Sequence, residues 1–196
     1  MKKLLIVVDM LNDFCSVGGV LSRKPDVVVG IDGLGPIVEP GEYYASSIIG
    51  DVAFLVNEYR AGKEPIIWLC DGHAKDDKEF DRFPPHAILN TWGAEIIDLL
   101  SPEIISQSGR ELMIRKTRYS GFYGTDLEYQ LARLAPEQTE VAGLCTSICV
   151  MDTVGGLANR DYNVVVYEDC VADFNPELHR IALERMEALY GAKVMW

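Results

Sequence analysis

The sequence predicts a three-layer α/β/α fold with a six-stranded, mostly parallel β-sheet. Short apolar runs rich in β-branched residues alternate along the chain with segments of helical periodicity, which is the pattern of βαβ units. Some runs, such as Val164–Val166, are apolar without interruption, as expected for strands that helices cover on both faces. Polar residues capable of chemistry follow several runs directly, where a parallel sheet carries its ligand sites.

Six apolar runs account for the strands of this sheet. We expect strands over residues 3–9, 65–70, 111–115, 138–143, 163–168 and 192–195. The first run follows two lysines, as in a signal peptide, but Asp9 interrupts it after a few residues. No apolar run approaches the roughly 18 residues of a membrane span, so we interpret the first run as a buried strand.

Five segments with helical periodicity separate or follow the strands. We expect helices near 46–62, 92–100, 124–134, 147–161 and 176–190. The last has Asn175 as its N-cap, Pro176 at the first helical position and Gly191 just past its end. Residues 16–45 contain six glycines and three prolines. A loop of this length is usually functional or an oligomer contact, with a disordered surface excursion as the alternative.

Length and composition favour one domain over residues 1–196, with no linker or internal repeat. The formal net charge is −12 and the 18 basic residues form no stripe, which argues against nucleic acid and anionic membranes as partners. Five cysteines without framework spacing, and no export signal, predict reduced thiols in a cytoplasmic protein. We expect Cys15, Cys70 and Cys170 to serve packing.

Three residues near different strand ends have the chemistry of an activated thiol. Cys149 sits at the expected start of a helix, whose positive dipole end and free amides favour a thiolate. Lys116 follows the third strand, and Asp9 ends the first and could accept the thiol proton. Each residue taken alone has an ordinary structural explanation: a cysteine that packs in the core, a lysine in solvent and an aspartate in a turn. Their coincidence at one sheet edge favours a nucleophile with its base.

A second group has the composition of a metal site. Asp71 and His73 follow the second strand two residues apart, so both side chains can reach one ion. His86 comes after a polar loop, in which Glu79 could be a fourth ligand or a supporting contact. Mixed imidazole and carboxylate ligands suit Zn²⁺, Mn²⁺ or Fe²⁺ rather than Ca²⁺. The third histidine, His179, is expected to be a surface residue on the last helix.

The chain resembles the isochorismatase-like cysteine hydrolases, and among them most closely the nicotinamidases, which also deamidate pyrazinamide. The similarity extends over nearly the whole chain and is strongest from 112 to 195. It is carried by Val8–Phe14, Asp71–His73, Phe83–His86, Lys116–Phe122 and Gly143–Val150. It implies the isochorismatase-like, Rossmann-like version of the predicted fold. The stretch between Phe14 and the second strand is longer than in the family pattern.

The resemblance assigns roles to individual positions. The family's catalytic triad falls on Asp9, Lys116 and Cys149. A cis peptide between Leu144 and Cys145 would turn the Cys145 amide toward the substrate, so that the amides of Cys145 and Cys149 form an oxyanion hole. The remaining implied positions are the metal ligands Asp71, His73 and His86, with Glu79 where some members place a carboxylate, and Phe14, Phe83 and Tyr119 as the residues that enclose an aromatic ring.

The implied activity is hydrolysis of nicotinamide to nicotinate and ammonia through a thioester on Cys149. One divalent ion is expected, Zn²⁺ first and Mn²⁺ or Fe²⁺ as alternatives, in a homo-oligomer. Isochorismatase, N-carbamoyl amidohydrolase or ureidoacrylate amidohydrolase activity would use a similar scaffold. A redox module built on the Cys145–Cys149 dithiol and a metal-bound regulatory protein without turnover are alternatives of a different class.

Overall fold

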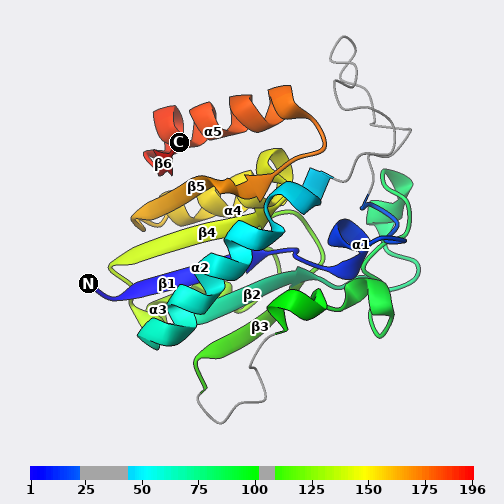
Figure 1. Cartoon of the computed structure of the whole chain (residues 1–196), viewed down its shortest axis with the longest axis horizontal. Coiled ribbons are helices and arrows are strands. Elements are labelled where there is room, and N and C mark those ends of the chain that lie inside the picture. Colours follow the sequence, from blue (N-terminus) through cyan, green and yellow to red (C-terminus); the bar gives the residue numbers. More distant parts are fainter. Residues whose placement is uncertain (23–43, 102–108) are drawn as a thin grey trace.

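A six-stranded sheet forms the centre of the molecule (Figure 1). The computed structural model describes residues 1–22, 44–101 and 109–196. The strands are β1 (Lys3–Val8), β2 (Ile66–Asp71), β3 (Glu111–Lys116), β4 (Gln138–Leu144), β5 (Val164–Ala172) and β6 (Lys193–Met195). Each predicted strand is present, and every pairing between them is parallel.

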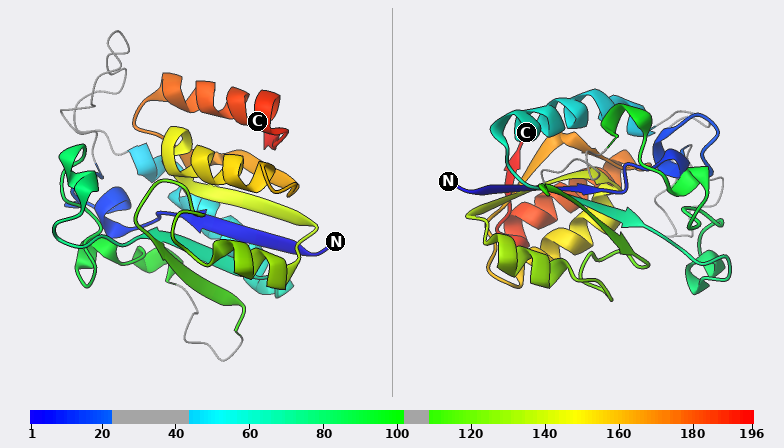
Figure 2. Two further views of the ribbon diagram at one scale, coloured as in Figure 1. Left: turned by 180° about the vertical axis from the view of Figure 1, so that it is seen from behind. Right: turned by 90° about the horizontal axis from the view of Figure 1, so that it is seen from below.

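Helices cover both faces of this sheet, which confirms the three layers (Figure 2). On one face lies α2 (Ile49–Gly62); on the other lie α3 (Leu127–Leu134), α4 (Met151–Ala158) and α5 (Pro176–Tyr190). The alternation of side chains along β1 divides the core accordingly. Leu5 and Val7 pack with the α2 side, whereas Leu4, Ile6 and Val8 pack with the other three helices.

The strand order β3-β2-β1-β4-β5-β6 makes β1 and β4 central neighbours. From β1 the chain proceeds outward through β2 to β3, and the second half proceeds in the other direction from β4 to β6. The order therefore reverses between β1 and β4. Ligands of open α/β sheets bind beyond the carboxyl ends of the strands at such a point. Asp9 follows β1 directly, and Cys149 lies five residues after β4.

The predicted helix over 92–100 is wrong. The segment contains two short 3₁₀ turns, Trp92–Ala94 and Asp98–Leu100, with extended residues between them. Ile96 forms an antiparallel bridge with Leu11, and the Glu95 carbonyl accepts the N–H of Asn12. This pairing lies beside the short helix α1 (Asn12–Cys15) and buries Ala94, Ile96, Ile97 and Leu100 without a helix, whereas Trp92 and Leu99 stay exposed.

The other predicted helices are present with altered ends. The segment predicted as 147–161 begins with a π-helical turn, Thr146–Val150, and continues as α4. In α5 the Asn175 side chain accepts from the N–H groups of Glu177 and Leu178, as a helix N-cap does. Most of the glycine- and proline-rich region, residues 23–43, lies outside the described residues. No helix in the described ranges is both long and apolar enough to cross a membrane.

Candidate active site

Asp9, Lys116 and Cys149 meet at the carboxyl end of the sheet. The Lys116 ammonium lies 2.7 Å from Asp9 Oδ2 and 3.4 Å from the Cys149 sulfur. One oxygen each of Asp9 and Asp71 lies with that sulfur in a group whose atoms are all within 4.8 Å of one another. All four side chains are buried. A lysine whose charge is this deeply enclosed needs anionic partners, and the two carboxylates supply them.

The backbone at Asp9 departs from the strand to aim its carboxylate. Its φ is 52°, in the left-handed region that residues other than glycine rarely adopt. The Asp9 N–H donates to Leu69 and its carbonyl accepts from Leu11, which holds the bend. Oδ1 accepts the N–H of Asp71 at 2.7 Å, leaving Oδ2 for Lys116. The carboxylate is therefore fixed on both oxygens.

Burial is the largest single influence on the pKa values of Asp9, Lys116 and Cys149. It raises the pKa of Asp9 to about 6, helped by the Asp71 charge and opposed by Lys116. It also raises the pKa of the Cys149 thiol well above its usual value, because Lys116 offsets only part of the burial and the two carboxylates add to it. Burial alone would lower the pKa of Lys116, but Asp71 and Asp9 raise it.

Burial opposes the thiolate form that a helix start and Lys116 were expected to favour. Cys149 lies inside the π-helical turn rather than at the first turn of an α-helix, and its surroundings carry two carboxylates as well as the ammonium. The raised pKa of Cys149 favours the thiol form. An oxygen of Asp9, whose pKa is raised to about 6, lies within 4.8 Å of the sulfur and makes Asp9 the candidate base.

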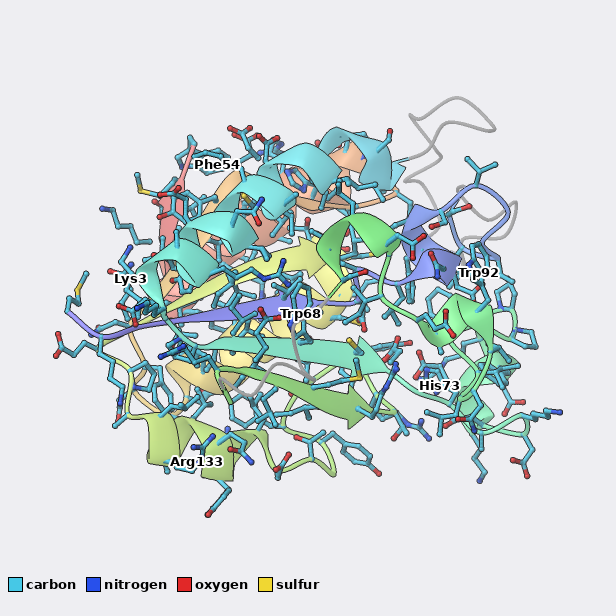
Figure 3. The ribbon with its side chains drawn as sticks, turned by 60° about the horizontal axis from the view of Figure 1, so that its bottom comes forward. Lys3, Phe54, Trp68, His73, Trp92 and Arg133 are labelled. Atoms are coloured by element: carbon cyan, nitrogen blue, oxygen red, sulfur yellow. The ribbon has the colours of Figure 1, made fainter. Side chains whose placement is uncertain are left out.

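Asp71, His73, Glu79 and His86 form a second buried cluster. Each offers one ligand atom, and these atoms all lie within 4.8 Å of one another. Asp71 Oδ2 is 3.7 Å from Nε2 of His73 and 3.8 Å from Nε2 of His86. Figure 3 shows His73 beyond the arrowheads of the strands, at the end of the sheet opposite Lys3. The structure thus brings together all four predicted ligands.

The polar atoms of this cluster suit a divalent cation. His86 Nδ1 lies 2.8 Å from the Pro84 carbonyl, so it carries the proton and Nε2 faces the cluster with a lone pair. Among the described residues, neither ring nitrogen of His73 nor Glu79 Oε2 makes a hydrogen bond of acceptable geometry. Buried polar atoms normally have partners. A cluster of two imidazoles and two carboxylates, in which these atoms of His73 and Glu79 lack partners, fits a metal ion.

Asp71 belongs to both groups. Its Oδ1 accepts from Lys116 at 2.5 Å, while Oδ2 faces the imidazoles. Burial by itself would raise the pKa of Asp71, but Lys116 and the two histidines lower it well below its ordinary value. The carboxylate therefore stays ionised, as a metal ligand must be.

A pocket opens beside both groups. The predicted ring-binding residues Phe14, Phe83 and Tyr119 all line it. Phe83 makes edge-on contacts with Tyr119 and His86, at ring-centre distances of 6.4 and 6.2 Å. The lining also includes residues that the sequence interpretation did not assign to the site: Leu21, Ile148 and Phe174. Leu21 comes from the glycine- and proline-rich region, so at least this part of it faces the pocket.

The turn that carries Cys149 is anchored to the start of α5. The Leu144–Cys145 peptide that precedes it is cis, as expected. The N–H and the hydroxyl of Ser147 both donate to Asp173 Oδ2 at 2.7 Å. The hydroxyl of Thr146 lies 2.9 Å from His179 Nδ1. The prediction that His179 is only a surface residue is therefore wrong, because its ring is partly buried against this turn.

Comparison with known proteins identifies the family. The family model described as the isochorismatase domain matches residues 3–195. The chain belongs to the isochorismatase family. This membership makes it a hydrolase of that family, and it favours neither the dithiol redox module nor the non-catalytic regulatory protein.

Two isochorismatase family members are similar to this chain in sequence over most of its length. PncA from Bacillus subtilis (strain 168) is 33% identical over 199 residues, which cover 99% of each chain. A ureidoacrylate amidohydrolase, RutB, from Methylobacterium radiotolerans is 28% identical over 209 residues, covering 95% of this chain and 74% of the relative.

Solved structures of family members share the fold. A crystal structure of nicotinamidase/pyrazinamidase PncA from Bacillus subtilis matches with a TM-score of 0.85 at 32% identity, over 100% of both chains. A pyrazinamidase of Pyrococcus horikoshii, crystallised in complex with zinc, matches with a TM-score of 0.79 at 28% identity, over 100% of this chain and 99% of that one.

Proposed function

We propose that this isochorismatase-family hydrolase is a nicotinamidase that converts nicotinamide to nicotinate and ammonia. The observation that carries the proposal is the composition of the pocket. Aromatic and aliphatic side chains form most of its walls, and Cys149 and the candidate metal ligands Asp71, Glu79 and His86 complete the lining. Such a pocket fits a flat, uncharged ring that bears an amide.

The pocket is poorly suited to anionic substrates. No lysine or arginine is among the described residues that line it, whereas Asp71 and Glu79 are. Ureidoacrylate is a carboxylate at neutral pH, and the described lining offers no basic side chain to pair with it. Enclosing a carboxylate without such a partner is costly. This argument favours nicotinamide over the substrate named for the RutB relative.

Cys149, Asp9 and Lys116 would carry the first half-reaction. Asp9 takes the proton from the thiol, and the sulfur attacks the carboxamide carbon to form a tetrahedral intermediate. The amides of Cys145 and Cys149 are proposed to hold its oxyanion; losing one such donor typically lowers the rate by ~10²–10³. Asp9 returns the proton to the nitrogen, ammonia leaves, and an acyl thioester remains. Lys116 stabilises the negative charge on Asp9 before it takes the proton and on the Cys149 sulfur afterwards.

Water completes the reaction. With ammonia gone, Asp9 is again unprotonated and can take a proton from a water molecule that attacks the thioester carbon. The C–S bond breaks as the second tetrahedral intermediate collapses, and Asp9 returns the proton to the sulfur. Nicotinate is released and the thiol is restored. Each half-reaction thus uses Asp9 first as a base and then as an acid.

Asp71, His73, Glu79 and His86 would hold one divalent ion, for which Zn²⁺ is the first expectation and Mn²⁺ or Fe²⁺ are alternatives. A bound ion would hold the pyridine nitrogen, directly or through water, and so orient the ring. Phe14, Phe83 and Tyr119 are proposed to enclose that ring. The zinc complex of the Pyrococcus horikoshii relative supports this choice of metal.

The deciding experiment is an ammonia-release assay on a panel of amides. Nicotinamide and pyrazinamide should be hydrolysed well, and ureidoacrylate poorly. If ureidoacrylate or an N-carbamoyl compound is the better substrate, the protein is a different amidohydrolase of the same family. Absence of nicotinamide hydrolysis by the metal-loaded protein would refute the proposal.

A further inference from the structure

Asp77 touches two of the four candidate metal ligands. Its Oδ1 accepts the N–H of Glu79 at 2.9 Å and so caps the 3₁₀ turn Lys78–Asp81, which carries Glu79. Its Oδ2 lies 3.2 Å from Nδ1 of His73. The side chain of Asp77 is 10% exposed, so water competes little for these contacts. One carboxylate therefore contacts both the ring of one ligand and the backbone of another.

The contact with His73 determines which ring nitrogen is free for a metal. Nε2 of His73 faces Asp71, and Nδ1 faces Asp77. Although the ring N–H and the oxygen do not meet strict hydrogen-bond geometry, a carboxylate at 3.2 Å favours the proton on Nδ1 and the lone pair on Nε2. In His86 the Pro84 carbonyl likewise favours the proton on Nδ1 and leaves Nε2 free.

Arg118 holds the carboxylate of Asp77 in place. It follows β3, and its Nη1 donates to Asp77 Oδ1 at 2.8 Å. The same nitrogen lies 3.9 Å from Oε2 of Glu79. The guanidinium thus lies close to both Asp77 and Glu79. Neither Asp77 nor Arg118 is within the described lining of the pocket, so neither is placed to touch a substrate.

We propose that Asp77 is a positioning residue of the metal centre, which orients His73 for coordination through Nε2 and sets the turn that presents Glu79. The inference rests on the metal site of the proposed function. It does not depend on which amide is hydrolysed. Supporting groups of this kind typically contribute about 10–100-fold to metal affinity.

The experiment measures metal affinity in the absence of substrate. The metal-free protein is titrated with Zn²⁺ in competition with a chromogenic chelator. In Asp77→Asn the amide oxygen can still accept from Glu79 and Arg118, but an NH₂ group then faces Nδ1 of His73. We expect Zn²⁺ to bind about 10–100-fold more weakly to this variant. Asp76→Asn makes the same change of charge at the adjacent, exposed residue and should leave the affinity unchanged.

Two further measurements separate positioning from general damage. Asp77→Ser keeps a side-chain cap for the Glu79 turn but removes the group facing His73, and it should weaken Zn²⁺ binding to a similar extent. Side-chain ¹⁵N spectra of the metal-free protein should show His73 with its proton on Nδ1, and this preference should diminish in both variants. Unchanged Zn²⁺ affinity in folded Asp77→Asn would overturn the proposal. A wild-type protein that binds Zn²⁺ but does not hydrolyse nicotinamide would instead refute only the substrate assignment.

Discussion

The Lys116 ammonium lies 2.5 Å from Asp71 Oδ1 and so joins the two halves of the candidate site. The same ammonium contacts Asp9 and the Cys149 sulfur, while the other oxygen of Asp71 faces the histidines. A change of charge at the Cys149 group therefore alters the electrostatic potential at the metal-ligand cluster, and the reverse also holds. The proposed nucleophile and the proposed metal ligands are electrostatically one unit.

Lys116→Met should destabilise the fold strongly. The substitution leaves Asp9 and Asp71 buried beside each other without their shared cation. Removing one partner of a buried ion pair typically costs about 3–5 kcal/mol of unfolding free energy. Denaturant unfolding at neutral pH measures the loss. Arg180→Gln removes a cation from exposed ion pairs on α5 and should leave the free energy of unfolding nearly unchanged. Equal losses in the two variants would contradict the role of Lys116 described above.

Cys149→Ala should abolish nicotinamide hydrolysis while leaving the metal content intact. Loss of a nucleophile that acts as one unit with its base commonly lowers kcat by at least about 10⁴-fold. Ammonia release and metal analysis on the same sample provide the measurement. Cys170→Ala, at a buried cysteine of the opposite core face, should retain most of the rate. Substantial turnover by Cys149→Ala would exclude this thiol as the nucleophile.

The rate should fall on the acid side of a pKa near that of Asp9. As the base, Asp9 must be unprotonated, and its pKa is raised to about 6. We therefore expect kcat/KM to be constant above that value and to fall tenfold per pH unit below it. Metal content is measured at each pH, because protonation of the histidines also releases metal. A profile that stays flat down to pH values well below about 6, with metal retained, would argue against Asp9 as the base.

Gly143→Ala should disturb the junction of β1 and β4. Gly143 has φ +115°, and a Cβ atom there would lie 2.0 Å from the Val8 carbonyl oxygen, one residue before Asp9. We expect a loss of more than about 2 kcal/mol of unfolding free energy, from strained backbone and overlap together. Gly50→Ala, in α2 and with open space around it, should instead stabilise by about 0.5–1 kcal/mol. Thermal and denaturant unfolding compare the two.

Local patterns were sufficient to predict the sheet and the last helix. Continuous β-branched runs such as Val164–Val166 have few alternatives to a covered strand, and the caps of α5 satisfy its end groups within a few residues of sequence. The helix predicted over 92–100 failed because Ile96 pairs with Leu11, far away in the chain. A periodicity argument considers only neighbours in sequence.

The candidate site was predictable where its residues carry distinctive chemistry. Asp9, Cys149 and His73 are distinctive in the sequence because their carboxylate, thiol and imidazole groups follow strand ends. Leu21 is not distinctive, since an aliphatic residue in a glycine-rich segment has no chemical signature, and only the folded chain places it in the pocket. The protonation of Cys149 was also beyond the sequence, because it depends on how deeply the sulfur is enclosed.

The reversal of strand order between β1 and β4 makes reactivity a property of the completed fold. The residues that would activate the thiol arrive from the beginning, the middle and the final third of the chain, so a partly synthesised or partly unfolded polypeptide carries only an ordinary cysteine. The proposed amide hydrolysis at this position would therefore require all three segments to have docked, although the thiol itself ionises more easily before the fold encloses it.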